Sequence, residues 1–211
     1  LSSVLAIEPT ARVARMRSAF FDVVPTVSID RARIEARVMK ETAGEPMITR
    51  RSKVFAAVVR EMPITIDPDE LIVGGTSTHS RCANLFPGTW DGRSRDTNLP
   101  GLSDDDMREL NEELAPFWSE QKRHVSWHYG HNIHNMKRVM KDGFLAMKKE
   151  AEDRLGSLDL DDPDDLKKQP FLEGAVIVLD AASEIGRRYA DRAAEMAETE
   201  IEDSEQLTAM E

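Results

Sequence analysis

The stretch Trp127-His128-Tyr129-Gly130-His131-Asn132-Ile133-His134 is the feature around which the chain is organised. It contains three of the 5 histidines, one of the 3 tryptophans and one of the 2 tyrosines. Directly after it, apolar side chains recur at three- and four-residue intervals from Met136 to Ala151. This periodicity is typical of a helix with one buried face. The pattern therefore predicts a helix over residues 133–155, with the histidine-rich stretch at its start.

Similar apolar stripes on both sides of this stretch predict further helices. The expected ranges are 11–22, 29–42, 48–61, 103–118 and 170–198. Ser28 is expected to cap the second of these helices, and Ser103 with Asp106 to form a capping box at the fourth. In the last of these helices, over residues 170–198, the expected buried stripe starts at Phe171 and includes Tyr189.

Two short strands are predicted between the helices. In residues 64–66 two isoleucines alternate with a threonine, and residues 71–73 form a short apolar run followed by two glycines. The first pattern favours an edge strand and the second a buried strand. Residues 76–101, rich in glycine, proline and polar side chains, are predicted to be a long loop, and loops of this length are usually functional or disordered. The predicted fold class is mostly α with two short strands.

Composition excludes several classes of function. The 211 residues carry a formal net charge of −11, which argues against binding nucleic acid or anionic membrane surfaces. No apolar run approaches the about 18 residues of a membrane span. The single cysteine, Cys82, excludes an internal disulfide and fits a reducing cytoplasm. The chain opens at Leu1 rather than Met, so we expect a segment excised from a longer protein.

The histidines of the central stretch allow two interpretations. His128, His131 and His134 are spaced by three residues, and such spacing on a helix can bind zinc, but no Asp or Glu nearby supplies an obvious further ligand. We therefore expect no metal site. His131, after Gly130, can hydrogen-bond a ligand or act as an acid or base near neutral pH. On chemistry alone a structural role is the more common one.

The other candidate lies in the long loop. Cys82 is preceded by Arg81 and follows His79, but a nucleophilic cysteine needs a lowered pKa and a lone cysteine is more often inert. Arg81 is equally suited to hold a carboxylate or a phosphate, because its guanidinium presents a planar fork of N–H donors.

The order in which several motifs occur along the chain is more specific evidence for a protein family than any one of these motifs alone. The chain resembles the N-terminal part of the pyruvate formate-lyase-like glycyl radical enzymes from about Arg12 to its end. It resembles their dehydratase, decarboxylase and carbon–nitrogen lyase branches more than pyruvate formate-lyase itself. The motifs that carry the resemblance are Ser28–Arg33, Glu41–Met47, Arg50–Lys53, Met62–Ile66, Asp69–Gly74, Arg81, Phe86-Pro87, Gly130-His131 and, in the late helix, Ala182, Ile185, Arg188–Ala190 and Ala193.

The resemblance implies that residues 1–211 are an incomplete domain, part of a ten-stranded α/β barrel built from two half-barrels. It also implies a glycyl radical, installed by an S-adenosylmethionine-dependent iron–sulfur activase, and a thiyl cysteine that abstracts hydrogen from substrate. Both of those loops lie in the later sequence of the family, and Cys82 comes far too early to be the thiyl cysteine. We therefore expect no catalytic residue and no bound cofactor in this chain, which the resemblance implies to be a fragment or one piece of a split enzyme.

What the resemblance assigns to this segment is part of the substrate-binding wall. The Gly-His step of glycerol dehydratase-like members, whose histidine contacts substrate hydroxyls, matches Gly130-His131. Trp127 and Tyr129 stand where relatives often place aromatic residues, and Arg81 is the fourth expected substrate-binding residue. The chain departs from the family at Ser52, where alanine is usual, at Gly88, where glutamate is frequent, and in a shortened 118–127 segment. These departures concern the substrate subclass.

The expected function is that of an anaerobe's glycyl radical lyase segment. The substrate is a small oxygenated or aryl-carboxylate compound, with dehydration, decarboxylation and addition of a hydrocarbon to fumarate all open. Expected partners are that substrate, the activase and a second copy in a homodimer in the cytoplasm. The alternative is a non-catalytic helical binding module derived from the same fold. The isolated segment is expected to expose apolar stripes of its last two helices and to aggregate.

Overall fold

The computed structural model describes residues 8–121, apart from 68, 76, 80 and 86–99, and residues 135–209. Within these ranges the chain is mostly helical, as predicted. The elements are α1 (Ala11–Asp22), β1 (Thr26–Ser28), α2 (Asp30–Glu41), α3 (Met47–Glu61), β2 (Cys82–Asn84), α4 (Asp104–Glu109), the π-helical turn η1 (Leu110–Leu114), α5 (Ala115–Glu120), α6 (Met136–Gly156), α7 (Pro163–Leu166) and α8 (Gln169–Ala209). No helix in this part of the chain is long and apolar enough to cross a membrane.

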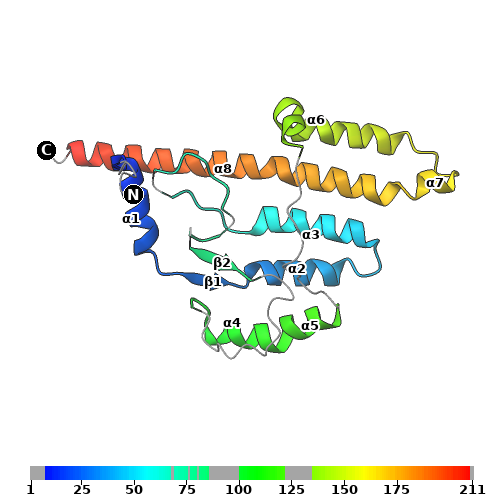
Figure 1. Cartoon of the computed structure of the whole chain (residues 1–211), viewed down its shortest axis with the longest axis horizontal. Coiled ribbons are helices and arrows are strands. Elements are labelled where there is room, and N and C mark those ends of the chain that lie inside the picture. The colour runs from blue at the N-terminus through cyan, green and yellow to red at the C-terminus, as the bar shows by residue number, and fades with distance from the viewer. Residues whose placement is uncertain are drawn as a thin grey trace, which may run out of the picture.

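The helices lie side by side in layers (Figure 1). α8 packs against α3 on one side and α6 on the other, while α2 packs against α3 and contacts η1. The main core lies among α2, α3, η1 and α5, and its most deeply buried large side chains are Ile29, Met39 and Met62. A smaller cluster joins Ala56 and Val59 of α3 to Ala181 of α8. The apolar stripe predicted for α3 is confirmed at Val54, Val58, Val59 and Met62, which are buried, but not at Phe55, which is 41% exposed.

The strands differ from the prediction. β1 and β2 form a parallel pair in which Thr26 is opposite Cys82 and Ser28 is opposite Asn84. Residues 64–66 and 71–73 are not strands, and the side chains of Leu71 and Ile72 are 77% and 89% exposed. The prediction of a buried strand there was wrong because an apolar run forms a strand only where a neighbouring backbone pairs with it.

The starts of two helices follow from local chemistry. The capping box at α4 is confirmed, because Ser103 and Asp106 bond each other's backbone N–H groups. At α2 the N-cap position is Ile29 rather than Ser28. Ser28 still supports this helix, since its hydroxyl accepts the N–H of Asp30 at 3.0 Å. α2 and α4 are then joined by Arg33, which contacts Asp106 at 2.5 Å.

α6 is interrupted, whereas a continuous helix was predicted. Gly143 has φ 73° and ψ 168°, a conformation outside the helical region and essentially restricted to glycine. The break lets Arg138 form an ion pair with Glu150, twelve residues later. Met140, before the break, is 81% exposed, so the predicted stripe does not continue across it. After the break, Ala151 is buried and α6 packs along α8.

α8 turns a different face inward from the one predicted at its start. Phe171 is 61% exposed, whereas Gly174 and Ala181 are buried. Further along, Tyr189 is buried as predicted, and its hydroxyl donates to the carbonyl of Gly75. A small residue at 174 is required because α3 and α8 approach each other closely there, so the buried face is set by backbone distance as well as by apolar content.

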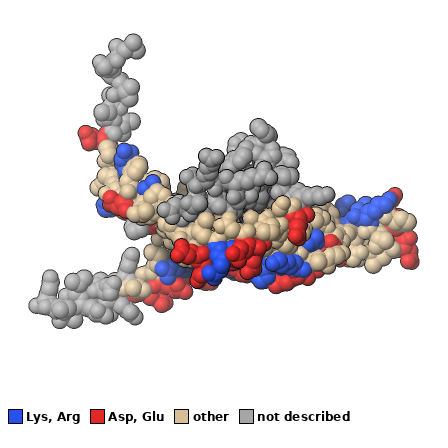
Figure 2. All heavy atoms as spheres, turned by 90° about the horizontal axis from the view of Figure 1, so that it is seen from below, with Lys and Arg blue, Asp and Glu red and all other residues tan. Residues whose placement is uncertain are grey.

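α1 stands apart from the layers, and Figure 2 shows it projecting from the body. None of its side chains is buried. Its first two turns are joined to Asp69 by Arg15, whose guanidinium makes a two-pronged ion pair with the carboxylate, and by Arg12, which donates to the carbonyl at 2.7 Å. Its apolar side chains are only partly covered, with Phe20 and Phe21 at 43% and 59% exposure. The predicted exposure of apolar surface is thus found on α1 as well as on α6 and α8.

Candidate functional site

The candidate site is the junction of α1, β1 and β2, where Arg81 lies. Of the four expected substrate-binding residues, Arg81 alone is among the described residues. Trp127, Tyr129 and His131 lie outside them, as do His128 and His134, so the histidine-rich stretch keeps the status of a prediction.

A short turn presents Arg81 at the start of β2. The backbone N–H of Thr26 in β1 donates to the carbonyl of Arg81 at 3.2 Å. The ring of His79 lies between the same two residues, with Nε2 2.7 Å from Thr26 Oγ1 and Nδ1 accepting the Arg81 N–H at 3.2 Å. The carbonyl of His79 accepts from Cys82 N–H at 3.0 Å and from the Ser77 hydroxyl at 2.8 Å. The turn is thus fixed by hydrogen bonds on both sides of Arg81.

The guanidinium of Arg81 extends toward the end of α1. Its Nη1 donates to the carbonyl of Val23 at 2.9 Å, and its carbon lies 5.1 Å from the centre of the Phe20 ring. A guanidinium carries five N–H donors, and within the part of the chain that the structure describes Val23 accepts from one of them. Chemically, the arrangement can hold a carboxylate, sulfonate or phosphate oxygen beside an aromatic face.

The other side of β1 is closed by residues 100–101. The N–H of Val27 donates to the carbonyl of Pro100 at 2.7 Å. Gly101 has φ +89°, and a Cβ built there would lie 2.6 Å from the Cβ of Thr26. Only glycine fits this position, because any side chain would displace the strand. Sequence reasoning did not single out Gly101, Thr26 or the bridging role of His79; the available signal was the crowding of His79, Arg81 and Cys82 into four residues of a predicted loop.

Cys82 does not form a nucleophile–base pair with His79 in this geometry. The thiol is partly buried and free of any disulfide. Both ring nitrogens of His79 are engaged, by Thr26 and by the Arg81 N–H, so the imidazole cannot take the thiol proton without losing one of them. The geometry supports the interpretation of Cys82 as an inert thiol.

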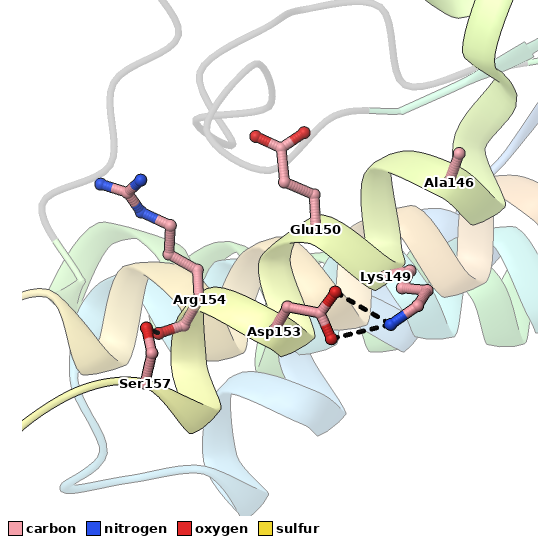
Figure 3. Close-up of a pocket in the computed structure, with 6 residues that line it drawn as sticks. All are labelled: Ala146, Lys149, Glu150, Asp153, Arg154 and Ser157. Atoms are coloured by element: carbon pink, nitrogen blue, oxygen red, sulfur yellow. Dashed lines mark hydrogen bonds and ion pairs between the residues drawn. The ribbon is translucent and has the colours of Figure 1, made fainter.

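One hollow, of about 550 Å³, lies between α1 and residues 67 and 70, and its lining includes Phe20 and Val23, which the Arg81 guanidinium contacts. Two other hollows lie away from Arg81. One, of about 510 Å³, runs along α6 and is drawn in Figure 3. Its polar side chains come from a single helix, and Lys149 is paired with Asp153 at 2.8 Å, an ordinary solvated helix pair. Because no groups from other elements converge on it, we do not consider it a binding site. The residues that line it are Ala146, Lys149, Glu150, Asp153, Arg154 and Ser157.

A second hollow, of about 490 Å³, lies between α2, α3, α6 and α8. Its floor is apolar, and at its edge Arg31 pairs with the buried Glu35 at 2.8 Å. It includes none of the expected site residues. Among the described residues, no group of three or more His, Cys, Asp and Glu side chains is arranged to hold a metal ion; the histidine-rich stretch is not covered by this statement.

The helices, the parallel strand pair and the position of Arg81 describe a fold. They do not by themselves define an activity. The chain belongs to the pyruvate formate lyase-like family, which matches residues 8–127 and 122–211. The prediction of the family is therefore confirmed. The chain is 28% identical over 236 residues to isethionate sulfite-lyase of Desulfovibrio desulfuricans, and 26% identical over 226 residues to trans-4-hydroxy-L-proline dehydratase of Clostridioides difficile. These alignments cover 90% and 92% of the chain but only 28% and 29% of the two relatives.

Solved structures agree with this assignment. A glycyl radical enzyme from Archaeoglobus fulgidus superimposes with a TM-score of 0.71 at 28% identity, over 84% of this chain and 27% of that one. The glycerol-bound form of the B12-independent glycerol dehydratase from Clostridium butyricum superimposes with a TM-score of 0.78 at 24% identity, over 90% of this chain and 28% of that one. The second likeness concerns the fold alone. The chain thus spans less than a third of the length of each of these relatives.

Proposed function

We propose that the protein containing this chain is a glycyl radical lyase or dehydratase that acts on a small hydroxylated substrate. The observation that carries the proposal is the family match along almost the whole chain, together with relatives named as lyases and dehydratases. Their names specify isethionate, hydroxyproline and sulfopropanediol. Decarboxylation and addition of a hydrocarbon to fumarate, also expected from the sequence, have no support among these names.

We propose that this chain contributes binding and orientation rather than the radical chemistry. In the family that chemistry depends on a glycyl radical installed by an iron–sulfur activase, and it supplies hydrogen abstraction from substrate. Within this chain, Arg81 is proposed to hold an anionic group, because its guanidinium is fixed at one Nη by Val23 and carries five N–H donors in all. His131 is proposed to hydrogen-bond a substrate hydroxyl, with Trp127 and Tyr129 beside it.

The proposal includes the larger architecture expected from the sequence. Residues 1–211 would be the N-terminal part of a barrel domain, and β1 and β2 would be two of its parallel strands. Parallel strands are normally covered on both faces and occur in larger sheets, which supports this assignment. A homodimer in the cytoplasm of an anaerobe is part of the same proposal, as is the activase as partner. The alternative, a non-catalytic binding module, predicts ligand binding without turnover.

The test is anaerobic activation of the natural protein that contains this chain. We expect incubation with a glycyl radical activase and S-adenosylmethionine to produce the electron paramagnetic resonance signal of a glycyl radical. Isethionate, trans-4-hydroxy-L-proline and glycerol are then offered separately, and loss of one of them is measured. The control omits the activase.

The outcomes separate the two hypotheses. A radical signal with consumption of one of the three compounds supports the enzyme. A radical signal without consumption would refute the proposed substrate class but retain the family chemistry. If no radical forms although the same activase preparation activates a known relative, the hypothesis of a glycyl radical enzyme is refuted. The alternative of a non-catalytic binding module is then favoured.

A further inference from the structure

We propose that His79 is the positioning residue of Arg81, and that it acts as a neutral imidazole in one defined tautomer. The inference rests on the proposed function in so far as Arg81 is taken to hold the substrate. It uses a residue to which neither the sequence motifs nor the comparisons assign a role. The proposal starts from the hydrogen bonds that His79 makes on each side of the turn.

The tautomer follows from the partners of the ring. A backbone N–H is always a donor, so His79 Nδ1, which accepts the Arg81 N–H at 3.2 Å, carries no proton. In a neutral imidazole the proton is then on Nε2, and Nε2 donates to Thr26 Oγ1 at 2.7 Å. His79 therefore connects the side chain of β1 with the backbone of the residue that precedes β2.

This connection fixes the direction of the Arg81 side chain. The carbonyl of Arg81 is already held by the Thr26 N–H at 3.2 Å, and His79 holds its N–H. With both of its backbone polar groups bonded, the backbone of Arg81 holds the Cα–Cβ bond in one direction, and the contacts of the guanidinium with Val23 and Phe20 restrain the side-chain torsions. Removing the acceptor at Nδ1 would release one of the two restraints.

Thr26 is itself immobilised, which makes it a firm support for His79. Gly101 lies so close to Thr26 that an added Cβ would be 2.6 Å from the Thr26 Cβ. β1 therefore cannot shift toward residue 101, and β2 pairs with β1 in register, with Thr26 opposite Cys82. The order of support is from Gly101 to Thr26, from Thr26 to His79, and from His79 to Arg81.

Two amide substitutions separate the roles of the two ring nitrogens, because each places an amide group near one of them. His79→Asn places an amide oxygen near the position of Nδ1 and keeps the acceptor for the Arg81 N–H. His79→Gln places an amide N–H near the position of Nε2 and keeps the donor to Thr26, but loses the acceptor. The experiment measures hydrogen exchange at the Arg81 amide, and the KM for isethionate, in the natural protein that contains this chain. Arg81→Met is the control that removes the guanidinium and leaves His79 in place.

We expect slow exchange of the Arg81 amide in the unsubstituted protein and in H79N, and about tenfold faster exchange in H79Q, as for loss of one backbone hydrogen bond. The KM for isethionate should follow the same order, rising in H79Q and in R81M. Equal exchange rates in H79N and H79Q would overturn the positioning role. If isethionate is not consumed by any form, the substrate proposed above is wrong, while the exchange rates still decide the role of His79.

Discussion

The close approach of α3 and α8 gives a prediction whose sign depends on a single oxygen atom. A Cβ added to Gly174 of α8 would lie 2.6 Å from the hydroxyl of Ser52 in α3, but 3.6 Å from the Ser52 Cβ. Gly174→Ala should therefore force the helices apart while Ser52 is present. In a Ser52→Ala background the offending atom is gone and 3.6 Å is ordinary van der Waals contact. The hydroxyl donates to the Ile48 carbonyl within its own helix, so its removal leaves no partner on α8 unsatisfied.

The magnitudes follow from two opposing effects. Overpacking a close contact costs about 1–3 kcal/mol, whereas replacing glycine by alanine inside a helix stabilises by about 1 kcal/mol. Gly174→Ala alone should lower the free energy of unfolding by about 1 kcal/mol once the gain of about 1 kcal/mol is subtracted from an overpacking cost of about 2 kcal/mol. In the S52A background it should raise that free energy by about 0.5–1 kcal/mol.

The assay is urea unfolding of the four proteins of this double-mutant cycle, followed by far-ultraviolet circular dichroism. The expected coupling between the two sites is about 1.5–2 kcal/mol, within the range found for residues in direct contact. An equal effect of Gly174→Ala in both backgrounds would refute the reasoning, because the clash with the hydroxyl would then not be the cause. Ser52, one of the departures from the family pattern, would in that case have no part in the packing of α8.

Three further predictions concern other positions that determine how the helices are shaped and joined. Gly143→Ala should lower the free energy of unfolding by about 1–3 kcal/mol because φ 73° with ψ 168° is strained for any residue with a Cβ. Urea unfolding measures this change. An unchanged free energy of unfolding would mean that α6 can straighten at residue 143 without cost. Arg188 donates to the carbonyls of Val59 and Met62 at the end of α3, so Arg188→Met should lower the free energy of unfolding by about 1.5–3 kcal/mol. A loss within about 0.5 kcal/mol, the size of an ordinary surface substitution, would contradict the role assigned to these bonds. Hydrogen bonds from the backbone and hydroxyl of Ser103, then the guanidinium of Arg33, lower the pKa of Asp106 to about 2. The contribution of the ionised Asp106 carboxylate to the free energy of unfolding is fully present above its ordinary pKa of about 3.9, and it is lost as the pH falls through about 2. An acid titration should therefore show a smaller loss of stability over this interval in D106N than in the parent, and parallel curves would contradict the assignment.

Helix positions were predictable from the sequence because their apolar periodicity is local. The stripes of α2 and α3 recur every three or four residues, and both helices begin within one residue of the predicted position. The break at Gly143 was not predictable, because a glycine within an apolar stripe is compatible with a continuous helix and the decisive φ is a property of the folded backbone.

The strands and the support of Arg81 depend on non-local pairing, which sequence patterns do not record. Cys82–Asn84 has no strong strand pattern and becomes a strand because β1 lies beside it. Arg81 could be selected from its chemistry alone. The role of His79 could not, since its partner Thr26 is 53 residues away. Residues 71–73 have a better strand pattern, but they pair with no described strand and remain exposed.

The parallel pairing of β1 and β2 also has a consequence for the order of folding. Its two strands are separated by the whole α2–α3 unit, so the loop-closure entropy of that connection must be offset before the ladder can form. Contacts between α2 and α3 are local by comparison and can form earlier. The strand pair, and with it the placement of Arg81, is therefore expected to be acquired late, and substitutions in the α2–α3 core should slow its formation even where they lie far from the arginine.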